Sequence, residues 1–105
     1  MEKMEKIIIT TNLDFVDTHI ILDIVNKTIS VSNKQLEYNQ SIIDNLLNII
    51  STWDTYYEDI NVLDGEYYKI DVISNLKTYS FTNNGAYPFN FISFKKWVEE
   101  LYDNR

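Results

Sequence analysis

The sequence predicts an α+β fold: an antiparallel β-sheet, with elements in the order βββ-α-ββ-α, and two helices packed on one face of it. Its 105 residues suit a single domain from residue 1 to residue 105. Two regions alternate apolar and polar residues, which indicates half-buried strands, and two others repeat apolar residues at three- and four-residue steps, which indicates helices. Turn-forming residues separate neighbouring strands closely, so most strand pairs are expected to be local and antiparallel.

The first third of the chain is predicted to be a three-stranded meander. Lys6–Asn12 is rich in β-branched residues, and Val16–Val25 alternates in polarity. Asn26-Lys27 is a candidate two-residue hairpin turn, because Asn tolerates positive φ, and Thr28–Ser32 then returns as a third strand.

A long amphipathic helix is predicted over Ser41–Asp59, with Asn39 or Ser41 as its N-cap. Its apolar positions recur at helical spacing. They are Ile42, Ile43, Leu46, Leu47, Ile49, Ile50, Trp53, Tyr56, Tyr57 and Ile60.

The remaining residues predict two strands and a final helix. Glu66–Ile73 and Leu76–Thr82 alternate in polarity and are joined by a turn at Ser74-Asn75. Asn90 is a candidate N-cap for a helix whose apolar stripe is Phe94, Trp97, Val98 and Leu101. Leu46, Ile50, Trp53 and Trp97 are expected in the core.

Between the last strand and the last helix, the segment Gly85-Ala86-Tyr87-Pro88-Phe89-Asn90-Phe91 resembles the ending of short uncharacterised proteins of low-GC Gram-positive bacteria. The turn Asp64-Gly65-Glu66 and the alternating strand after it fit the same pattern. The resemblance covers residues 64–105. It implies the strand–helix arrangement of this part and no particular activity. Abundant Ile and Asn, beside a single Ala, likewise suggest an AT-rich genome of a bacterium or phage.

Composition excludes several kinds of site. The chain has no Cys, which excludes disulfides, thiolate metal sites and a Cys nucleophile. It has one His, His19, whose neighbour Asp17 on the same strand face forms a base–orienter pair only in principle, because no nucleophile is implied. Gly65 and Gly85 are the only glycines, so no Gly-rich phosphate loop is present. We therefore expect neither a metal nor another cofactor, and no enzyme activity.

The formal net charge of −7 is concentrated in one part of the chain. No Lys or Arg lies between Lys34 and Lys69, whereas nine acids balance nine bases elsewhere. Direct nucleic-acid binding is not expected, because that needs cations to replace phosphate counterions. No signal peptide or membrane-length apolar run is visible, so the cytoplasm is the expected location. The acids in the gap are Glu37, Asp44, Asp54, Glu58, Asp59, Asp64 and Glu66.

The acidic segment is the candidate partner-binding site. An ordinary exposed helix mixes both charges, because Glu–Lys pairs stabilise it by roughly 0.2–0.5 kcal/mol each. A helix face that carries acids alone indicates docking of a basic protein surface, although a merely solvated face stays open as the alternative. Tyr is favoured at interfaces because it joins a large apolar area to a polar tip. The candidate residues are Asp44, Leu47, Asp54, Tyr57, Glu58, Asp59, Asp64, Glu66 and Tyr67.

The expected function is that of a small acidic protein-binding inhibitor, of the immunity-protein or antitoxin type, that neutralises a toxin or enzyme by docking on its basic surface. Two alternatives stay open. One is a phage-encoded counter-defence protein, anti-CRISPR or anti-restriction, whose acids imitate DNA phosphates. The other is a regulatory or assembly subunit.

Overall fold

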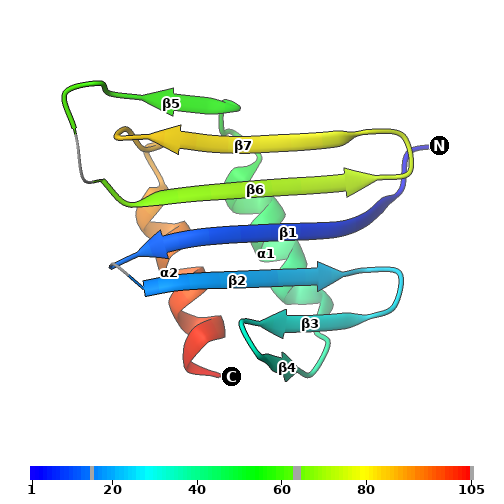
Figure 1. Cartoon of the computed structure of the whole chain (residues 1–105). Coiled ribbons are helices and arrows are strands. Elements are labelled where there is room, and N and C mark those ends of the chain that lie inside the picture. The colour runs from blue at the N-terminus through cyan, green and yellow to red at the C-terminus, as the bar shows by residue number, and fades with distance from the viewer. Residues whose placement is uncertain (15, 63–64, 105) are drawn as a thin grey trace.

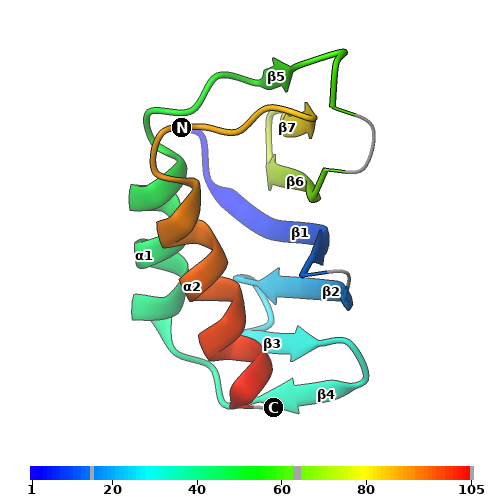
Figure 2. The ribbon, with the colours of Figure 1, turned by 90° about the vertical axis from the view of Figure 1, so that its left-hand side faces the viewer.

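A computed structural model describes residues 1–14, 16–62 and 65–104 and shows two layers. Its seven strands form one sheet in the order β4-β3-β2-β1-β6-β7-β5. Both described helices lie on the same face of this sheet (Figures 1 and 2). The predicted α+β class and the one-sided helical layer are therefore confirmed. The elements are β1 (Met4–Leu13), β2 (Val16–Asp23), β3 (Thr28–Val31), β4 (Lys34–Leu36), α1 (Gln40–Ile50), β5 (Tyr56–Glu58), β6 (Tyr67–Ser74), β7 (Thr78–Asn84) and α2 (Phe91–Asp103).

Strand β1 is the centre of the sheet. It pairs antiparallel with β2, its neighbour in sequence, and with β6, which lies more than 50 residues further along the chain. Its odd-numbered residues from Ile7 to Leu13 are buried under the helices, and its even-numbered ones are half-buried on the open face. The predicted meander of the first three strands is confirmed. In the turn between β2 and β3, however, Lys27 rather than Asn26 has the positive φ, at 54°.

The predicted long helix is too long, because α1 ends at Ile50. Residues Tyr56–Glu58 form β5, which pairs parallel with β7, so the sheet is mixed rather than antiparallel. Adjacent Tyr56 and Tyr57 suit a strand as well as a helix stripe, and the free edge of β7 supplies hydrogen bonds such as that from the Thr82 amide to the Thr55 carbonyl, at 2.9 Å. Pairing with β7 therefore places Tyr56 and Tyr57 in a strand, although their spacing also fits the apolar stripe of a helix. The short edge strand β4 was not predicted either.

The predicted core residues are buried. Leu46 and Ile50 of α1 and Trp97 of α2 pack with Trp53 in one apolar cluster. The ring of Trp53 lies 5.0 Å from that of Tyr68 and 5.4 Å from that of Phe94, measured between centroids. Aromatic packing therefore joins the segment after α1 to the middle of the sheet and to α2.

Asn90 occupies the N-cap position of α2 but does not cap the helix with its side chain, contrary to the prediction. Its Oδ1 accepts a hydrogen bond of 2.6 Å from Trp53 Nε1, and its Nδ2 donates one of 2.9 Å to the Ile49 carbonyl. The amide thereby satisfies a terminal carbonyl of α1 and fixes the indole. Asn39, in contrast, caps α1 as predicted, because its Oδ1 accepts from the Ser41 amide.

Two buried hydroxyls face the helices from directly paired residues, Thr11 of β1 and Tyr68 of β6. Within the part of the chain that the structure describes, neither has a hydrogen-bond partner. Burial raises the pKa of the Tyr68 hydroxyl, because the phenolate loses its solvation.

Replacing Asn90 by Ala should lower the free energy of unfolding by about 2–4 kcal/mol, because the indole N–H and the Ile49 carbonyl both lose their partner. Chemical denaturation measures the loss. Asn45→Ala, at an exposed position of α1, is the control and should cause no loss. Equal stability of Asn90→Ala and the parent chain would contradict this role.

Replacing Tyr68 by Phe should leave stability unchanged or raise it by up to about 1 kcal/mol, because no hydrogen bond of the described residues is lost. Above about pH 10 the unfolded state loses the Tyr68 proton while the folded state keeps it, so the parent loses stability as pH rises. Denaturation midpoints from pH 8 to 11 should fall less steeply for Tyr68→Phe. A large loss of stability at pH 7 would show that the hydroxyl is bonded.

Candidate functional site

One end of the sheet collects acids from three separate segments. Strands β1, β5 and β7 end there, and β2 and β6 begin there, on the left of Figure 1 and facing the viewer in Figure 2. We call this region the acidic end. Its carboxylates are Asp14 and Asp17 at the β1–β2 turn, Glu58 and Asp59 at the end of β5, and Glu66 just before β6.

A lysine joins two of these three segments, the β1–β2 turn and the residues before β6. Lys95 of α2 places its Nζ 3.0 Å from Glu66 Oε1 and 3.2 Å from Asp14 Oδ1. The Asp14 amide also donates a hydrogen bond of 2.6 Å to Glu66 Oε2. The hydrogen bond to Glu66, followed by that to Asp14, raises the pKa of Lys95, so the ammonium stays charged. Asp17, Glu58 and Asp59 have no ion pair among the described residues, and their charge faces solvent.

The two glycines of the chain, Gly65 and Gly85, lie close together at this end of the sheet. Gly85 has φ +82°, and a Cβ built on it would lie 2.6 Å from the Asp59 carbonyl oxygen. A Cβ on Gly65 would lie 2.7 Å from the Tyr87 hydroxyl and 3.4 Å from Gly85 Cα. The loop after β5 therefore packs directly on the connection between β7 and α2. Asn83 reinforces this packing, because its Nδ2 donates to the carbonyls of Glu66 and Ala86, at 3.1 Å each.

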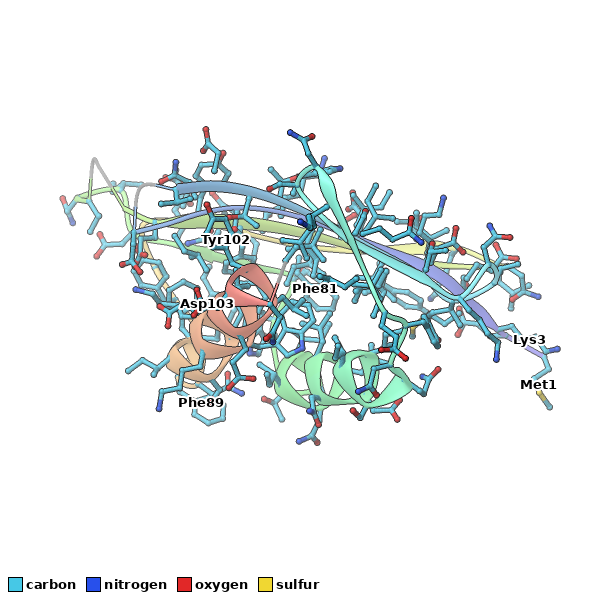
Figure 3. The ribbon with its side chains drawn as sticks, turned by 90° about the horizontal axis from the view of Figure 1, so that it is seen from below. Met1, Lys3, Phe81, Phe89, Tyr102 and Asp103 are labelled. Carbon is cyan, nitrogen blue, oxygen red and sulfur yellow. The ribbon has the colours of Figure 1, made fainter. Side chains whose placement is uncertain are left out.

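Exposed apolar side chains lie in the segments that carry these acids and in the connection from β7 to the first turn of α2. Phe89 is 88% exposed and Ile60 is 77% exposed. Phe89 points away from the sheet, on the outside of the helical layer (Figure 3). Tyr87 is held in place by a stacked contact with Phe91, with 4.5 Å between ring centroids. The exposed apolar residues of these segments are Val16, Ile60, Val62, Tyr67, Tyr87, Phe89 and Ile92. Together with the acidic end they form what we call the end surface.

The structure divides the predicted partner-binding residues into two groups. Glu58, Asp59, Glu66 and Tyr67 lie at the end surface, although the first two lie in and after a strand rather than on a helix. Asp64 lies outside the described residues. The others lie elsewhere: Asp44 is exposed on α1, Leu47 is half-buried at the edge of α1, Asp54 is exposed before β5, and Tyr57 is half-buried and accepts a 3.0 Å hydrogen bond from the Asp54 amide.

Sequence reasoning missed several residues of the end surface. Asp14 and Asp17 are distant in sequence from the acidic segment, and only the pairing of β1 with β6 brings them beside Glu66 and Tyr67. The aromatic residues beside Pro88 can be read from the sequence, but their exposure cannot, so Phe89 could not be told from a core residue. The Glu66–Lys95 pair had no sequence signal, because the two residues lie 29 positions apart.

The described structure does not bring His19 and Asp17 together as a base–orienter pair. His19 lies on the open face, and its Nδ1 lies 3.4 Å from Thr10 Oγ1, whereas Asp17 instead accepts a bond of 2.7 Å from Asn12 Nδ2. Within residues 1–14, 16–62 and 65–104, no group of three or more His, Asp or Glu is placed to hold a metal ion. Over those same residues, neither helix has the length and apolar character needed to cross a membrane.

Comparison with known proteins adds no relative: no protein-family model matches the chain, and no curated protein and no solved structure matches it either. The end surface is therefore interpreted from its own residues.

Replacing Gly85 by Ala should destabilise the protein by about 1–3 kcal/mol, because an L side chain at φ +82° is strained and its Cβ would collide with backbone. Gly65→Ala is the matched comparison and should cost less, since its Cβ meets the far end of the Tyr87 side chain, which can shift. Thermal denaturation of both variants measures the difference. Equal stability of the two variants would contradict the close approach at Gly85.

Proposed function

We propose that this chain is a small acidic inhibitor, of the immunity-protein or antitoxin type, that neutralises a toxin or enzyme by docking the end surface onto a basic region of it. The observation that supports the proposal best is the coincidence of unpaired carboxylates and exposed apolar side chains at one end of the sheet. Protein interfaces combine apolar and aromatic anchors with a polar rim, and the end surface has both parts.

The carboxylates favour a basic partner. The net charge of −7 gives the whole molecule a negative field, and the solvent-facing acids Asp17, Glu58 and Asp59 direct part of it outward from one end. Complementary charge accelerates encounter by factors of about 10 to 1000 at low salt and matters less for the lifetime of the complex. A cellular inhibitor of a harmful enzyme benefits from fast capture.

The apolar side chains supply the anchors. A Phe that is 88% exposed forfeits the free energy of burying its ring, which is roughly 1.5–3 kcal/mol. Tyr87 is ordered by its stack on Phe91, so its burial against a partner would cost little side-chain entropy. Phe89 and Tyr87 are therefore the proposed anchors, and their truncation should act mainly on the dissociation rate.

The test begins with affinity capture of the partner and a measurement of whether equimolar protein abolishes the activity of that partner. The double reversal Asp17→Lys and Glu58→Lys should then weaken binding about tenfold or more, mainly through slower association. Surface plasmon resonance at two salt concentrations separates the association rate from the dissociation rate, because salt screens the encounter.

The matched control is the double reversal Glu37→Lys and Glu100→Lys, which changes the net charge equally at exposed positions outside the end surface. Glu99 and Asp103 are unsuitable as controls, because they line a depression together with Asp14 and Val16. If both double variants weaken binding equally, the effect comes from the net charge alone, and the end surface is not the interface. Binding without inhibition would instead indicate the regulatory or assembly subunit.

A second function has a specific observation in its favour. The acids of the end surface come from three segments and occupy one end of the molecule, which suits imitation of a phosphate backbone better than a single helix does. Under the counter-defence proposal, this chain is a phage-encoded protein of the anti-CRISPR or anti-restriction type, and its partner is a nucleic-acid-binding protein. Double-stranded DNA should then compete with this chain for the captured partner, whereas it should not compete if the partner binds no nucleic acid.

A further inference from the structure

The helical layer leaves part of the sheet without a helix. The ten residues of β1 extend about 33 Å, whereas two helices packed side by side across the strands occupy about 20 Å. Figures 1 and 3 show that both helices cross the strands, and that the strands continue past α1 toward the N-terminal end of the molecule. By these lengths, roughly 13 Å of the strands extends beyond the two helices, which is about the diameter of one more helix.

The border of this region is an apolar groove of about 220 Å³. Its walls come from the last turns of α1 and from the helix-side face of β6 and β7, and Phe81 lies on that face in Figure 3. Tyr79 and Phe81 are only half-buried, although they pair directly with the buried core residues Val72 and Ile70 of β6. The groove is lined by Leu47, Ile50, Ser51, Trp53, Val72, Tyr79 and Phe81.

The two sides of the groove carry different charges. Asp44 lies one helical turn before Leu47, and Asp54 directly follows Trp53; both are exposed, and α1 carries no basic residue. On the opposite side, Lys77 Nζ lies 4.6 Å from the Tyr79 ring centroid. The Tyr79 hydroxyl donates to both oxygens of Glu2, at 2.9 and 2.7 Å, so that acid is already engaged. On the α1 side, Asp44 Oδ1 accepts a hydrogen bond of 3.1 Å from the neutral amide of Gln40. Neither Asp44 nor Asp54 has an ion pair among the described residues, so the carboxylates on this side can still attract a cation.

We propose that the groove binds an amphipathic helix of a partner protein, which lies beside α1 as a third helix of the layer, with Leu-like side chains in the groove and Lys or Arg facing Asp44 and Asp54. Helix-in-groove recognition requires apolar residues one turn apart along one helix face, and a basic flank complements the acids of α1. This site lies apart from the end surface and does not rest on the function proposed for it.

The probe is a synthetic helical peptide of Leu, Ala and Lys, with Leu at positions i, i+4 and i+7 and Lys beside them. A twin peptide carries Glu in place of Lys. Titration into the isotope-labelled full-length chain should shift the signals of Leu47, Phe81 and the Trp53 indole, and leave those of Ile60 and Phe89 in place. The chain has two Trp, so there are two indole N–H signals: Trp53 donates to Asn90 Oδ1, and Trp97 of α2 donates to the Ile42 carbonyl of α1.

Four variants locate the site, two at the groove and two matched controls elsewhere, so that the test does not depend on a single variant folding correctly. Leu47→Asn removes a groove side chain, and Ile60→Asn makes the same kind of change, with no change in charge, at the end surface. Asp44→Lys reverses an exposed acid beside the groove, and Glu100→Lys reverses one elsewhere. Binding should weaken about tenfold for Leu47→Asn and about threefold for Asp44→Lys, and stay unchanged for the two controls.

Each other result overturns the proposal. Equal weakening by Ile60→Asn or Glu100→Lys would mean that the basic peptide binds the acidic molecule without using the groove. Equal affinity for the peptide with Glu in place of Lys would contradict the proposed attraction of a basic helix to Asp44 and Asp54. Shifts of the Leu47 signal with protein concentration, in the absence of peptide, would make a second copy of this chain the occupant. Because these variants leave Asp17 and Glu58 intact, failure here does not affect the test of the end surface.

Discussion

The side-chain amide of Asn90 is the constraint on which the functional surfaces depend. It joins the end of α1, the indole of Trp53 and the start of α2, which are otherwise separate segments. Fixing Trp53 in the core directs the following residues toward the free edge of β7, where they become β5. In the short connection between β7 and the start of α2, Pro88 is buried and Phe89 points outward. The end surface therefore results from a core interaction rather than from a flexible loop.

The acids at the acidic end are distributed over several strands. Net negative charge destabilises a compact state through self-repulsion, and placing the solvent-facing acids Asp17 and Glu58 on different strands of the sheet reduces this cost. Lys95 neutralises part of the charge at Asp14 and Glu66 by forming an ion pair with each of them. Asp14 is paired although its side chain is 64% exposed, so it is the contact with Lys95 rather than burial that distinguishes Asp14 and Glu66 from the acids without an ion pair, Asp17, Glu58 and Asp59.

The two proposed surfaces have different physical origins. The end surface combines charge with protruding side chains such as Phe89, and it suits the flat or concave surface of a folded partner. The groove is a recess with half-buried walls, Tyr79 and Phe81, and it suits a protruding element such as a helix. Its existence follows from a mismatch of length, because ten-residue β1 extends further than two crossing helices can cover.

The sequence by itself determined the α+β class, the N-terminal meander, the β6–β7 hairpin and the burial of Leu46 and Trp97, because these depend on local periodicity and on the free energy of burying apolar side chains. The tertiary structure alone decided where the helix ends and which acids come together. Residues 53–58 satisfy helical and strand patterns alike, and the unpaired backbone of β7 selects the strand. Asp17 lies near Tyr67 only because β1 pairs with β6 across more than 50 residues. Such pairing depends on the shape and hydrogen-bonding of the whole sheet, which no local pattern encodes.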